Sequence, residues 1–379
     1  MQTTKTIALV ANTTWNIYNF RLNVIRKFIA EGYSVIVFSP IDEFIHYKKE
    51  FSNVQHVSIN SLDRDGTNPL KDLALVLELK RLYQKYQPDL ILHYTIKPNI
   101  YGAVAARLVR IPSVGIVTGL GYSFLHKGLI SSISRWLYQI SLRYHKKVIF
   151  ENQDDRMLFI EQGITKEENS ISIKGCGVNT KHYIPLSSEK SRKTIFSFLG
   201  RLLYDKGIQE FAEAAEIVKR DYDDVEFWLV GDIDDQNPAS VKKEDILAWV
   251  KQGIVLYHGS TTDVRTFISE SSCIVLPSYR EAIARSLTEA MAMERPVIAT
   301  DVAGCREAIK EGCNGYLVKV KDANSLAEAF VSFIHLTHDE RAEMGKNGRQ
   351  MVLEEFDDRL IAKDIYNICR DILNPIQRH

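Results

Sequence analysis

Short runs of β-branched and other apolar residues alternate along the chain with longer segments in which apolar residues recur at helical spacing. In the first half the pattern predicts strands over residues 7–11, 34–38, 54–59, 90–93, 114–117 and 148–150, and helices over 18–31, 70–86, 100–109 and 130–144. A second series predicts strands over 194–199, 226–230, 254–257, 273–276 and 296–299, and helices over 208–220, 243–251, 264–270 and 285–293. This alternation is typical of βαβ units. We therefore expect an α/β protein with two doubly wound, Rossmann-like domains facing each other across a cleft.

A polar, proline-containing stretch at residues 184–193 separates the two series and predicts a linker. The expected domains are residues 1–183 and 193–359. The end of the chain, from about residue 325 to 374, is predicted to be mostly helical, and its last helix, over residues 360–373, is long enough to cross back, so that residues 360–379 complete the first domain. Ligands of open parallel sheets bind at the carboxyl ends of the strands, so the loops that follow the strands are the expected place for chemistry.

The formal net charge of the 379 residues is zero, but this is the sum of two opposite halves. Residues 1–180 carry 22 basic and 15 acidic side chains, whereas residues 181–379 carry 26 and 33. No Asp or Glu occurs from residue 90 to residue 150, a stretch that contains eight Lys or Arg. The overall balance argues against a nucleic-acid-binding protein, and the first half is expected to meet an anionic partner.

The five cysteines show no metal-ligand spacing, so they favour neither a disulfide framework nor a structural metal site and fit a reducing cytoplasm. The start of the chain lacks the apolar core of a signal peptide, and no window approaches ~20 uninterrupted apolar residues. We expect a cytoplasmic protein without a membrane-spanning segment.

One motif follows the strand expected at residues 273–276 and leads directly into a helix. Glu281 lies in the loop, and Glu289 lies further on, within the helix among apolar neighbours. Free N–H groups at a helix start attract an anion such as a diphosphate, and a ribose diol could hydrogen-bond to a carboxylate at Glu289. The amides at this helix start belong to Ile283, Ala284, Arg285 and Ser286. The spacing alone is equally compatible with two unremarkable surface glutamates.

A second motif follows the first strand of the second series, where Gly200 and Arg201 precede Lys206 and Gly207. A glycine at a strand end lets the backbone approach a ligand, and the two cations could hold a diphosphate. The alternative is a solvated helix start. The chain contains neither G-x-x-x-x-G-K-[ST] nor G-x-G-x-x-G here, which disfavours nucleotide hydrolysis and dinucleotide binding.

Together the motifs of the second half resemble the retaining glycosyltransferases of family 4, which have the GT-B fold. The resemblance is carried by Gly200-Arg201, Lys206-Gly207, Val230-Gly-Asp232, His258-Gly259, residues 276–281 with Glu289 eight positions later, residues 295–300, Gly304-Cys-Arg-Glu307 and Asn314-Gly-Tyr-Leu317. The first half is similar to a bacterial branch of that family that builds capsules and lipid-linked oligosaccharides, through residues 16–21, 97–99, 118–121 and 177–179 with Pro185.

The resemblance implies a role for each motif. Glu281 would contact hydroxyls of the donor sugar and Glu289 the ribose, while Arg201 and Lys206 would neutralise the diphosphate leaving group. Gly200, Gly259 and the four helix-start residues would complete the nucleotide-sugar site. The family needs no metal or other cofactor, so Asp232-Ile-Asp234 is expected to be a loop without an ion.

The sequence departs from the family pattern at several positions. Ala282 and Glu294 stand where members usually have Gly, and Ala284 stands where they often have Pro. A methyl group at Ala282 would reshape the donor loop if that position requires a positive φ, which bears on donor identity. The histidine that several members have after the strand expected at 114–117 is also absent, and Thr118 stands there.

In the first half, Asn16, Arg21, Lys97 and Thr118 are the candidates for the acceptor side, because they lie at or after the carboxyl ends of predicted strands. Lys97 would suit a pyrophosphate-bearing acceptor. Arg21 could equally be a cation on a helix surface. His93 is expected to be a packed strand histidine rather than a catalytic one.

Residues 126–147 combine basic side chains with apolar residues at helical spacing. Such a helix can lie on an anionic membrane surface, and the surface residues would be Arg135, Arg143, Lys146 and Lys147. The alternative is a helix with its apolar face on the sheet and its cations in water. We favour the membrane surface because the surrounding stretch contains no acidic residue.

These observations predict a retaining glycosyltransferase on the inner face of the membrane. It would move a hexose or N-acetylhexosamine from a nucleotide diphosphate sugar, expected to be UDP-linked, to a polyprenyl-diphosphate-linked saccharide in surface polysaccharide or glycan biosynthesis. Two alternatives remain open at this point: a nucleotide-sugar epimerase of the same fold, and a non-catalytic nucleotide-sugar-binding partner.

Overall fold

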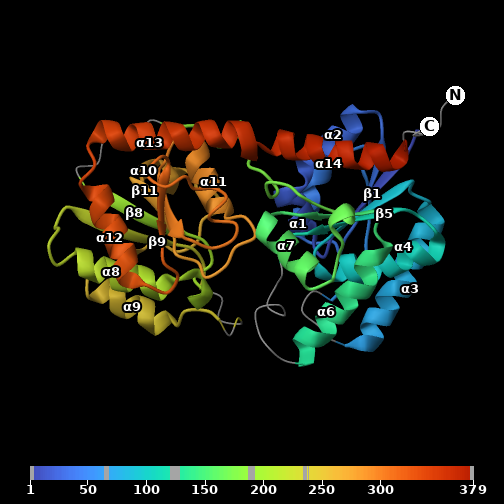
Figure 1. The fold of residues 1–379 in the computed structure, drawn as a ribbon, viewed down its shortest axis with the longest axis horizontal. Helices are drawn as coiled ribbons and strands as arrows, with labels where there is room; N and C mark the ends of the chain where they lie inside the picture. The colour runs from blue at the N-terminus through green and yellow to red at the C-terminus, as the bar shows by residue number, and fades with distance from the viewer. Residues whose placement is uncertain are drawn as a thin grey trace. The chain divides into compact units, whose positions relative to one another are not determined.

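The computed structural model of the chain describes residues 4–63, 68–119, 129–186, 193–233, 237 and 239–375, and for residues 129–131 it describes the backbone alone. The chain divides into two compact units, each a parallel sheet between helices (Figure 1). Unit 1 is Met1–Cys176 together with Asp358–His379, and unit 2 is Gly177–Asp357. The expected α/β class with two Rossmann-like sheets is confirmed.

Unit 1 contains a seven-stranded parallel sheet with the order β3-β2-β1-β4-β5-β6-β7. The strand order reverses beside β1. In a doubly wound sheet the ligand-binding crevice lies at this point, outside the carboxyl ends of the strands. The central strands are buried on both faces, which explains why they read as continuous apolar runs. The strands are β1 (Thr6–Val10), β2 (Ser34–Phe38), β3 (Gln55–Val57), β4 (Leu90–Tyr94), β5 (Ser113–Val117), β6 (Lys147–Phe150) and β7 (Ser170–Ser172).

The helices of unit 1 are α1 (Thr14–Phe20), α2 (Leu22–Ala30), α3 (Pro69–Tyr86), α4 (Ala103–Val109), α6 (Leu129–Ser141), α7 (Gln153–Glu161) and α14 (Asp358–Leu373). Right-handed crossovers place α3, α4, α6 and α7 on one face of the sheet and α1 and α2 on the other. The last helix, α14, packs beside α2 and contributes Ile361, Ala362, Ile365 and Cys369 to the core of unit 1.

Unit 2 contains a six-stranded parallel sheet with the order β10-β9-β8-β11-β12-β13. Its strands are β8 (Thr194–Leu199), β9 (Val225–Val230), β10 (Leu256–Tyr257), β11 (Cys273–Leu276), β12 (Val297–Thr300) and β13 (Gly315–Val318). Its helices are α8 (Ile208–Val218), α9 (Lys243–Lys251), α10 (Arg265–Glu270), α11 (Arg285–Ala292), α12 (Ala323–Ile334) and α13 (His338–Met351). Here too the order reverses beside the first strand, β8, so β8 and β11 lie side by side.

The structure differs from the predicted elements in two respects. The single helix expected over residues 18–31 is two helices: Thr13 caps α1 by accepting a hydrogen bond from the Asn16 N–H, and Arg21 interrupts the helix at φ −124° and ψ 0°. In addition, α7 and the edge strands β7 and β13 are not among the elements predicted from the sequence. These strands are three and four residues long, too short for a clear periodicity.

The boundary between the units lies before Gly177, earlier than the expected end of the first domain at residue 183. The reason is local: the Val178 N–H donates to the Phe356 carbonyl at 2.8 Å, and Tyr183 is buried in the core of unit 2. Most of the expected linker, residues 187–192, lies outside the described residues. None of the helices in the described ranges has both the length and the apolar character needed to cross a membrane.

Candidate active site

The two sequence motifs of unit 2 meet at the carboxyl ends of β8 and β11. The loop after β8 contains Gly207 at φ +73°, and a Cβ there would lie 2.1 Å from the Pro277 carbonyl oxygen. Only glycine allows this approach. The Tyr279 N–H also donates to the Asp205 carbonyl at 2.8 Å, so the two loops form one surface.

Lys206 and Glu281, which are 75 residues apart in sequence, form an ion pair on this surface. Lys206 Nζ lies 2.5 Å from Glu281 Oε1, and the side chains are 23% and 12% exposed. A third loop, which follows β12, supports them: Gly304 has φ +73°, and a Cβ there would lie 2.5 Å from the Ala282 carbonyl oxygen. The loops that follow β8, β11 and β12 therefore hold this ion pair in place.

Arg201 and the start of α11 complete the features that suit a diphosphate. Arg201 is exposed, and it forms no ion pair with any residue that the structure describes. No side chain caps α11, whose N-cap residue is Ala284. A helix start without a side-chain cap keeps N–H groups available to an anion.

Glu289 is buried, so the alternative that it is a surface glutamate is wrong. Its Oε1 lies 2.6 Å from Arg285 Nε, and the Tyr183 hydroxyl hydrogen-bonds to the carboxylate. Burial raises the pKa of Glu289, an effect that Arg285 and Tyr183 oppose. Burial also raises the pKa of Tyr183. Tyr183 is not among the residues predicted from the sequence, because nothing in residues 177–183 marks which side chain turns toward α11.

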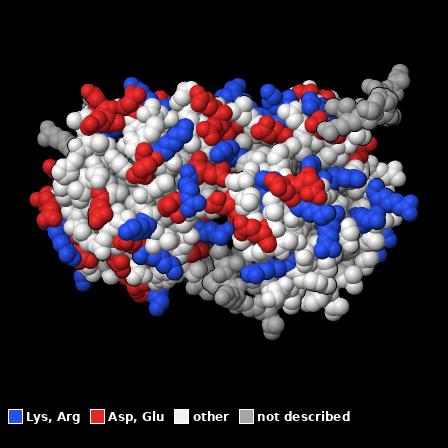
Figure 2. Space-filling view, viewed as in Figure 1, with Lys and Arg blue, Asp and Glu red and all other residues white. Residues whose placement is uncertain are grey.

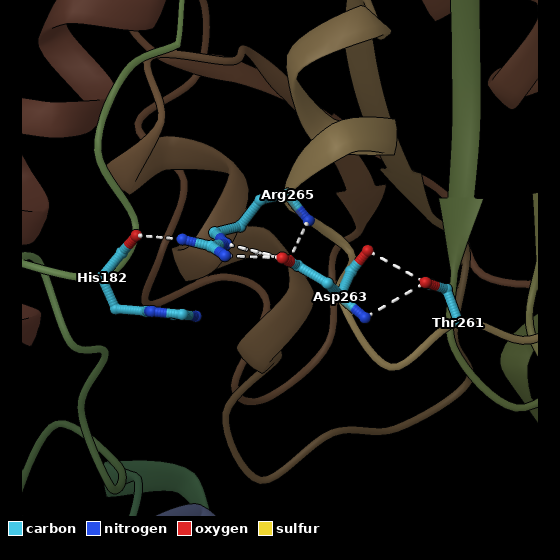
Figure 3. Close-up of polar contacts among 4 residues, drawn as sticks. All are labelled: His182, Thr261, Asp263 and Arg265. Atoms are coloured by element: carbon cyan, nitrogen blue, oxygen red, sulfur yellow. Dashed lines mark hydrogen bonds and ion pairs between the residues drawn. The ribbon is translucent and has the colours of Figure 1, made fainter.

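A further network joins this segment to the loop after β10 (Figure 3). Arg265 Nη1 donates to the His182 carbonyl at 3.5 Å, and the same guanidinium binds both carboxylate oxygens of Asp263. The Asp263 N–H donates to Thr261 Oγ1 at 3.1 Å. The bond from Arg265 lowers the pKa of Asp263 to about 2, so the pair is fully charged at neutral pH.

A methyl group at Ala282 is expected to reshape the donor loop only if this position has a positive φ. Ala282 is not among the residues with positive φ, so its methyl group fits the loop without strain. Glu294 does adopt a left-handed conformation, with φ +59°, at a position where family members usually have Gly. Gly259 has φ +71°, and its carbonyl accepts a hydrogen bond from the Gly231 N–H at 2.8 Å. Asp234 of the Asp-Ile-Asp sequence lies outside the described residues.

In unit 1 the two predicted acceptor-side cations are engaged within the protein. Arg21 is 2% exposed and bound to Glu151, so it is not a cation on a helix surface. Lys97 Nζ lies 2.8 Å from Asp72 Oδ1, and the Tyr101 hydroxyl donates to the other oxygen of that carboxylate. Lys97 is thus held within unit 1 by an ion pair, and its contact with a pyrophosphate stays a prediction.

The remaining candidates of unit 1 are placed as follows. Asn16 is buried in α1, and Thr118 directly follows β5 with a partly exposed side chain. His93 is fully buried and bonded to the Tyr83 hydroxyl at 2.9 Å, and burial lowers its pKa well below the usual value. The expectation of a packed strand histidine is confirmed.

The helix expected to meet a membrane, α6, leaves apolar side chains uncovered. Ile133 and Trp136 are 56% and 58% exposed, so these two do not pack on the sheet. Arg143 and Lys146 are exposed, Arg135 is partly buried, and Lys147 donates to the Glu168 carbonyl at 2.5 Å. The first residues of the predicted segment, 126–128, lie outside the described residues.

A second apolar stripe lies on α3, which occupies the same face of the sheet as α6. Leu70, Leu73 and Leu77 are 77%, 56% and 45% exposed. Their spacing of three and four residues marks one side of a helix and could have revealed the stripe. On the face seen in Figure 2, acidic and basic side chains intermingle on each unit, so the opposite net charges of the two halves do not form two uniform surfaces there.

Comparison with known proteins assigns the family. A model described as glycosyl transferases group 1 matches residues 182–351, and one described as glycosyl transferase 4-like matches residues 6–152. The chain belongs to this glycosyltransferase family. The resemblance expected from the motifs is thereby confirmed, and both models favour transfer over the epimerase alternative.

The glycosyltransferase is similar to enzymes that act on lipid-linked saccharides. It is 28% identical over 374 residues to the N,N'-diacetylbacillosaminyl-diphospho-undecaprenol alpha-1,3-N-acetylgalactosaminyltransferase of Campylobacter jejuni, covering 94% of this chain and 96% of that protein. It is 24% identical over 301 residues to the UDP-Gal:alpha-D-GlcNAc-diphosphoundecaprenol alpha-1,3-galactosyltransferase of Escherichia coli, covering 76% of each.

Among solved structures, the glycosyltransferase resembles Anabaena Alr3699/HepE in complex with UDP and glucose. The TM-score is 0.78 at 20% identity, over 96% of this chain and 99% of that one. At this level of identity the likeness concerns the fold, and it confirms the expected GT-B class.

Proposed function

We propose that this glycosyltransferase moves a hexose or N-acetylhexosamine, with retention of configuration, from a UDP-sugar to a saccharide on polyprenyl diphosphate. The observation that carries the proposal is the Lys206–Glu281 ion pair between the carboxyl ends of β8 and β11, beside an exposed Arg201 and a helix start without a side-chain cap. This combination offers cations and amides to a diphosphate and a carboxylate to sugar hydroxyls.

Charge stabilisation is the main chemical task of such a site. In the transfer step the bond between the anomeric carbon and the diphosphate oxygen breaks, and the acceptor hydroxyl oxygen bonds to that carbon from the same side. The hydroxyl proton passes to the leaving diphosphate. Negative charge therefore develops on the diphosphate, where Arg201 and Lys206 would stabilise it.

Other residues of unit 2 would hold the donor. Glu281 would accept hydrogen bonds from the donor sugar, and the buried Glu289 would accept them from the ribose. The backbone at Gly200 and Gly259, and the residues Ile283, Ala284, Arg285 and Ser286 at the start of α11, would surround the nucleotide. In this proposal two protein cations do the work of a metal ion, so transfer should continue in EDTA.

The acceptor assignment rests on the relatives, whose names specify undecaprenol-linked saccharides. A lipid-linked acceptor requires a protein that works at a membrane surface. The exposed leucines of α3 and the exposed Ile133 and Trp136 of α6 would enter the interface, while Arg143 and Lys146 would meet anionic headgroups. We propose contact with the inner face of the membrane.

The decisive experiment supplies the purified enzyme with UDP-glucose, UDP-galactose and their N-acetyl forms, and with short-chain prenyl-diphosphate N-acetylhexosamine acceptors. We expect one donor to give a disaccharide whose new linkage keeps the α configuration of the donor by NMR. Inversion at the anomeric carbon would contradict the retaining step. UDP binding without transfer to any acceptor would favour a non-catalytic partner.

A further inference from the structure

The buried carboxylate of Glu151 stands at the carboxyl edge of the sheet in unit 1. Glu151 directly follows β6, and its backbone is fixed from both sides: its N–H donates to the Val117 carbonyl at 3.3 Å, and its carbonyl accepts from the Gly175 N–H at 3.0 Å. The side chain is 8% exposed. It is also the first carboxylate after the acid-free stretch that ends at residue 150.

Arg21 holds this carboxylate by one oxygen. Both Nη1 and Nη2 lie 3.2 Å from Glu151 Oε1, and the guanidinium stacks on Tyr94 with 4.3 Å between its carbon and the ring centroid. Glu151 Oε2 has no hydrogen-bond partner within the part of the chain that the structure describes. The arrangement fixes the carboxylate and keeps one of its oxygens unused.

Stabilisation of the fold does not explain the ion pair between Arg21 and Glu151. A buried ion pair seldom stabilises a fold more than apolar residues of the same volume, because both charges lose their hydration. Burial raises the pKa of Glu151, and Arg21 opposes the rise.

Other polar atoms at the same edge also lack partners among the described residues. Tyr94 is the last residue of β4, and Thr95 follows it. The Tyr94 hydroxyl and Thr95 Oγ1 are both buried, and neither forms a hydrogen bond with the described residues. Thr95 adopts φ +69°, an unusual conformation for a β-branched residue. Strained backbone and unsatisfied polar groups gather at functional sites more often than elsewhere.

We propose that Glu151 Oε2 accepts a hydrogen bond from a hydroxyl or amide N–H of the acceptor saccharide, and that Arg21 is its positioning residue. This inference rests on the proposed function. A carboxylate oxygen only accepts hydrogen bonds, so the group it binds must be a donor. The neighbouring guanidinium cancels the charge, so the pair favours neither a phosphate nor a cation. Sugar hydroxyls and acetamido groups meet both conditions.

The test compares Glu151→Gln with the wild type, using short-chain prenyl-diphosphate N-acetylhexosamine acceptors and the monodeoxy analogues of each. The amide oxygen of Gln can still accept from Arg21, so the fold should persist. We expect kcat/KM for the acceptor to fall roughly 10- to 100-fold, the range for one hydrogen bond to a charged group, while UDP-sugar hydrolysis is unchanged. Glu161→Gln, an exposed change on α7, is the matched control.

The deoxy analogues separate acceptor binding from a structural role. One analogue should be a poor acceptor for the wild type yet no worse than its parent for Glu151→Gln, because the partner it lacks is already gone. Arg21→Lys should show the same pattern in weaker form. If Glu151→Gln fails to fold, the double variant Arg21→Gln/Glu151→Gln replaces it.

Two results would overturn the inference while leaving the proposed function standing. One is wild-type acceptor kinetics in Glu151→Gln. The other is an equal loss for every deoxy analogue in the variant and the wild type. If the wild type transfers to no lipid-linked acceptor, the proposed function fails, and this inference falls with it.

Discussion

In unit 1 the two candidate acceptor-side cations are largely buried in ion pairs, whereas in unit 2 the two candidate diphosphate-binding cations are more exposed. Arg21 and Lys97 are 2% and 14% exposed, and each has a carboxylate partner. Lys206 is 23% exposed in its pair with Glu281, and Arg201 is exposed. The net charges of the two halves would predict the opposite, because residues 1–180 are net basic and residues 181–379 are net acidic. In the proposed function, therefore, local placement and not average charge decides where the diphosphate binds.

The largest effect should come from the ion pair of unit 2. Glu281→Gln removes a negative acceptor for the donor sugar and the partner of Lys206, so we expect transfer to fall on the order of 10²- to 10³-fold with the fold retained. Steady-state kinetics checks this, with Glu270→Gln, an exposed change on α10, as the control. Full activity in Glu281→Gln would remove the donor-site assignment.

The same kind of change in unit 1 should act on stability instead. Lys97→Met leaves Asp72 buried beside Tyr101 without its cation, so the free energy of unfolding should fall by about 3 kcal/mol. Urea unfolding measures this, and adding Asp72→Asn should restore much of the loss. If Lys97→Met is as stable as the wild type, the ion pair is not structural.

UDP affinity tests the contrast directly. Replacing Arg201 and Lys206 together by Met removes two charge-assisted contacts, so we expect Kd for UDP to rise roughly 100-fold in calorimetry. Lys97→Met should leave UDP affinity unchanged. Equal losses in both variants would mean that the two units do not divide the work as proposed.

The electrostatic part of membrane binding should depend on the basic residues of unit 1 and not on those of unit 2. Arg143→Gln with Lys146→Gln should weaken binding to vesicles with anionic lipid about tenfold at low salt, and the difference should shrink as salt screens the charges. Arg220→Gln, an exposed change in unit 2, is the control. Sedimentation with vesicles checks the result, and equal binding by all variants would contradict the proposed surface.

The smallest effect concerns Ala282. Since this residue does not adopt a positive φ, Ala282→Gly relieves no strain, and donor kinetics should change less than about twofold. A large gain in activity would show that the methyl group does constrain the donor loop.

Much of the fold was predictable because strands buried on both faces read as apolar runs, as in β1 and β11. The meeting of Lys206 and Glu281 was also predictable in outline, since the carboxyl ends of adjacent parallel strands share one edge.

The environment of Arg21 could not be predicted. Its partner Glu151 is 130 residues away, and an Arg after an amphipathic segment reads the same whether it is buried or solvated. The spacing of the α3 leucines indicates an apolar side of a helix, but their exposure could not be predicted, because helical period does not show whether the fold covers that side.

The return of α14 to unit 1 has a consequence for how the protein is made. Unit 1 is discontinuous in sequence, and four buried residues of its core, from Ile361 to Cys369, are synthesised after the whole of unit 2. Unit 2 can therefore complete its core while unit 1, although translated first, still lacks the helix that packs beside α2. We therefore expect unit 1, whose synthesis begins first, to be the last to complete its core, and removal of α14 to destabilise unit 1 rather than unit 2.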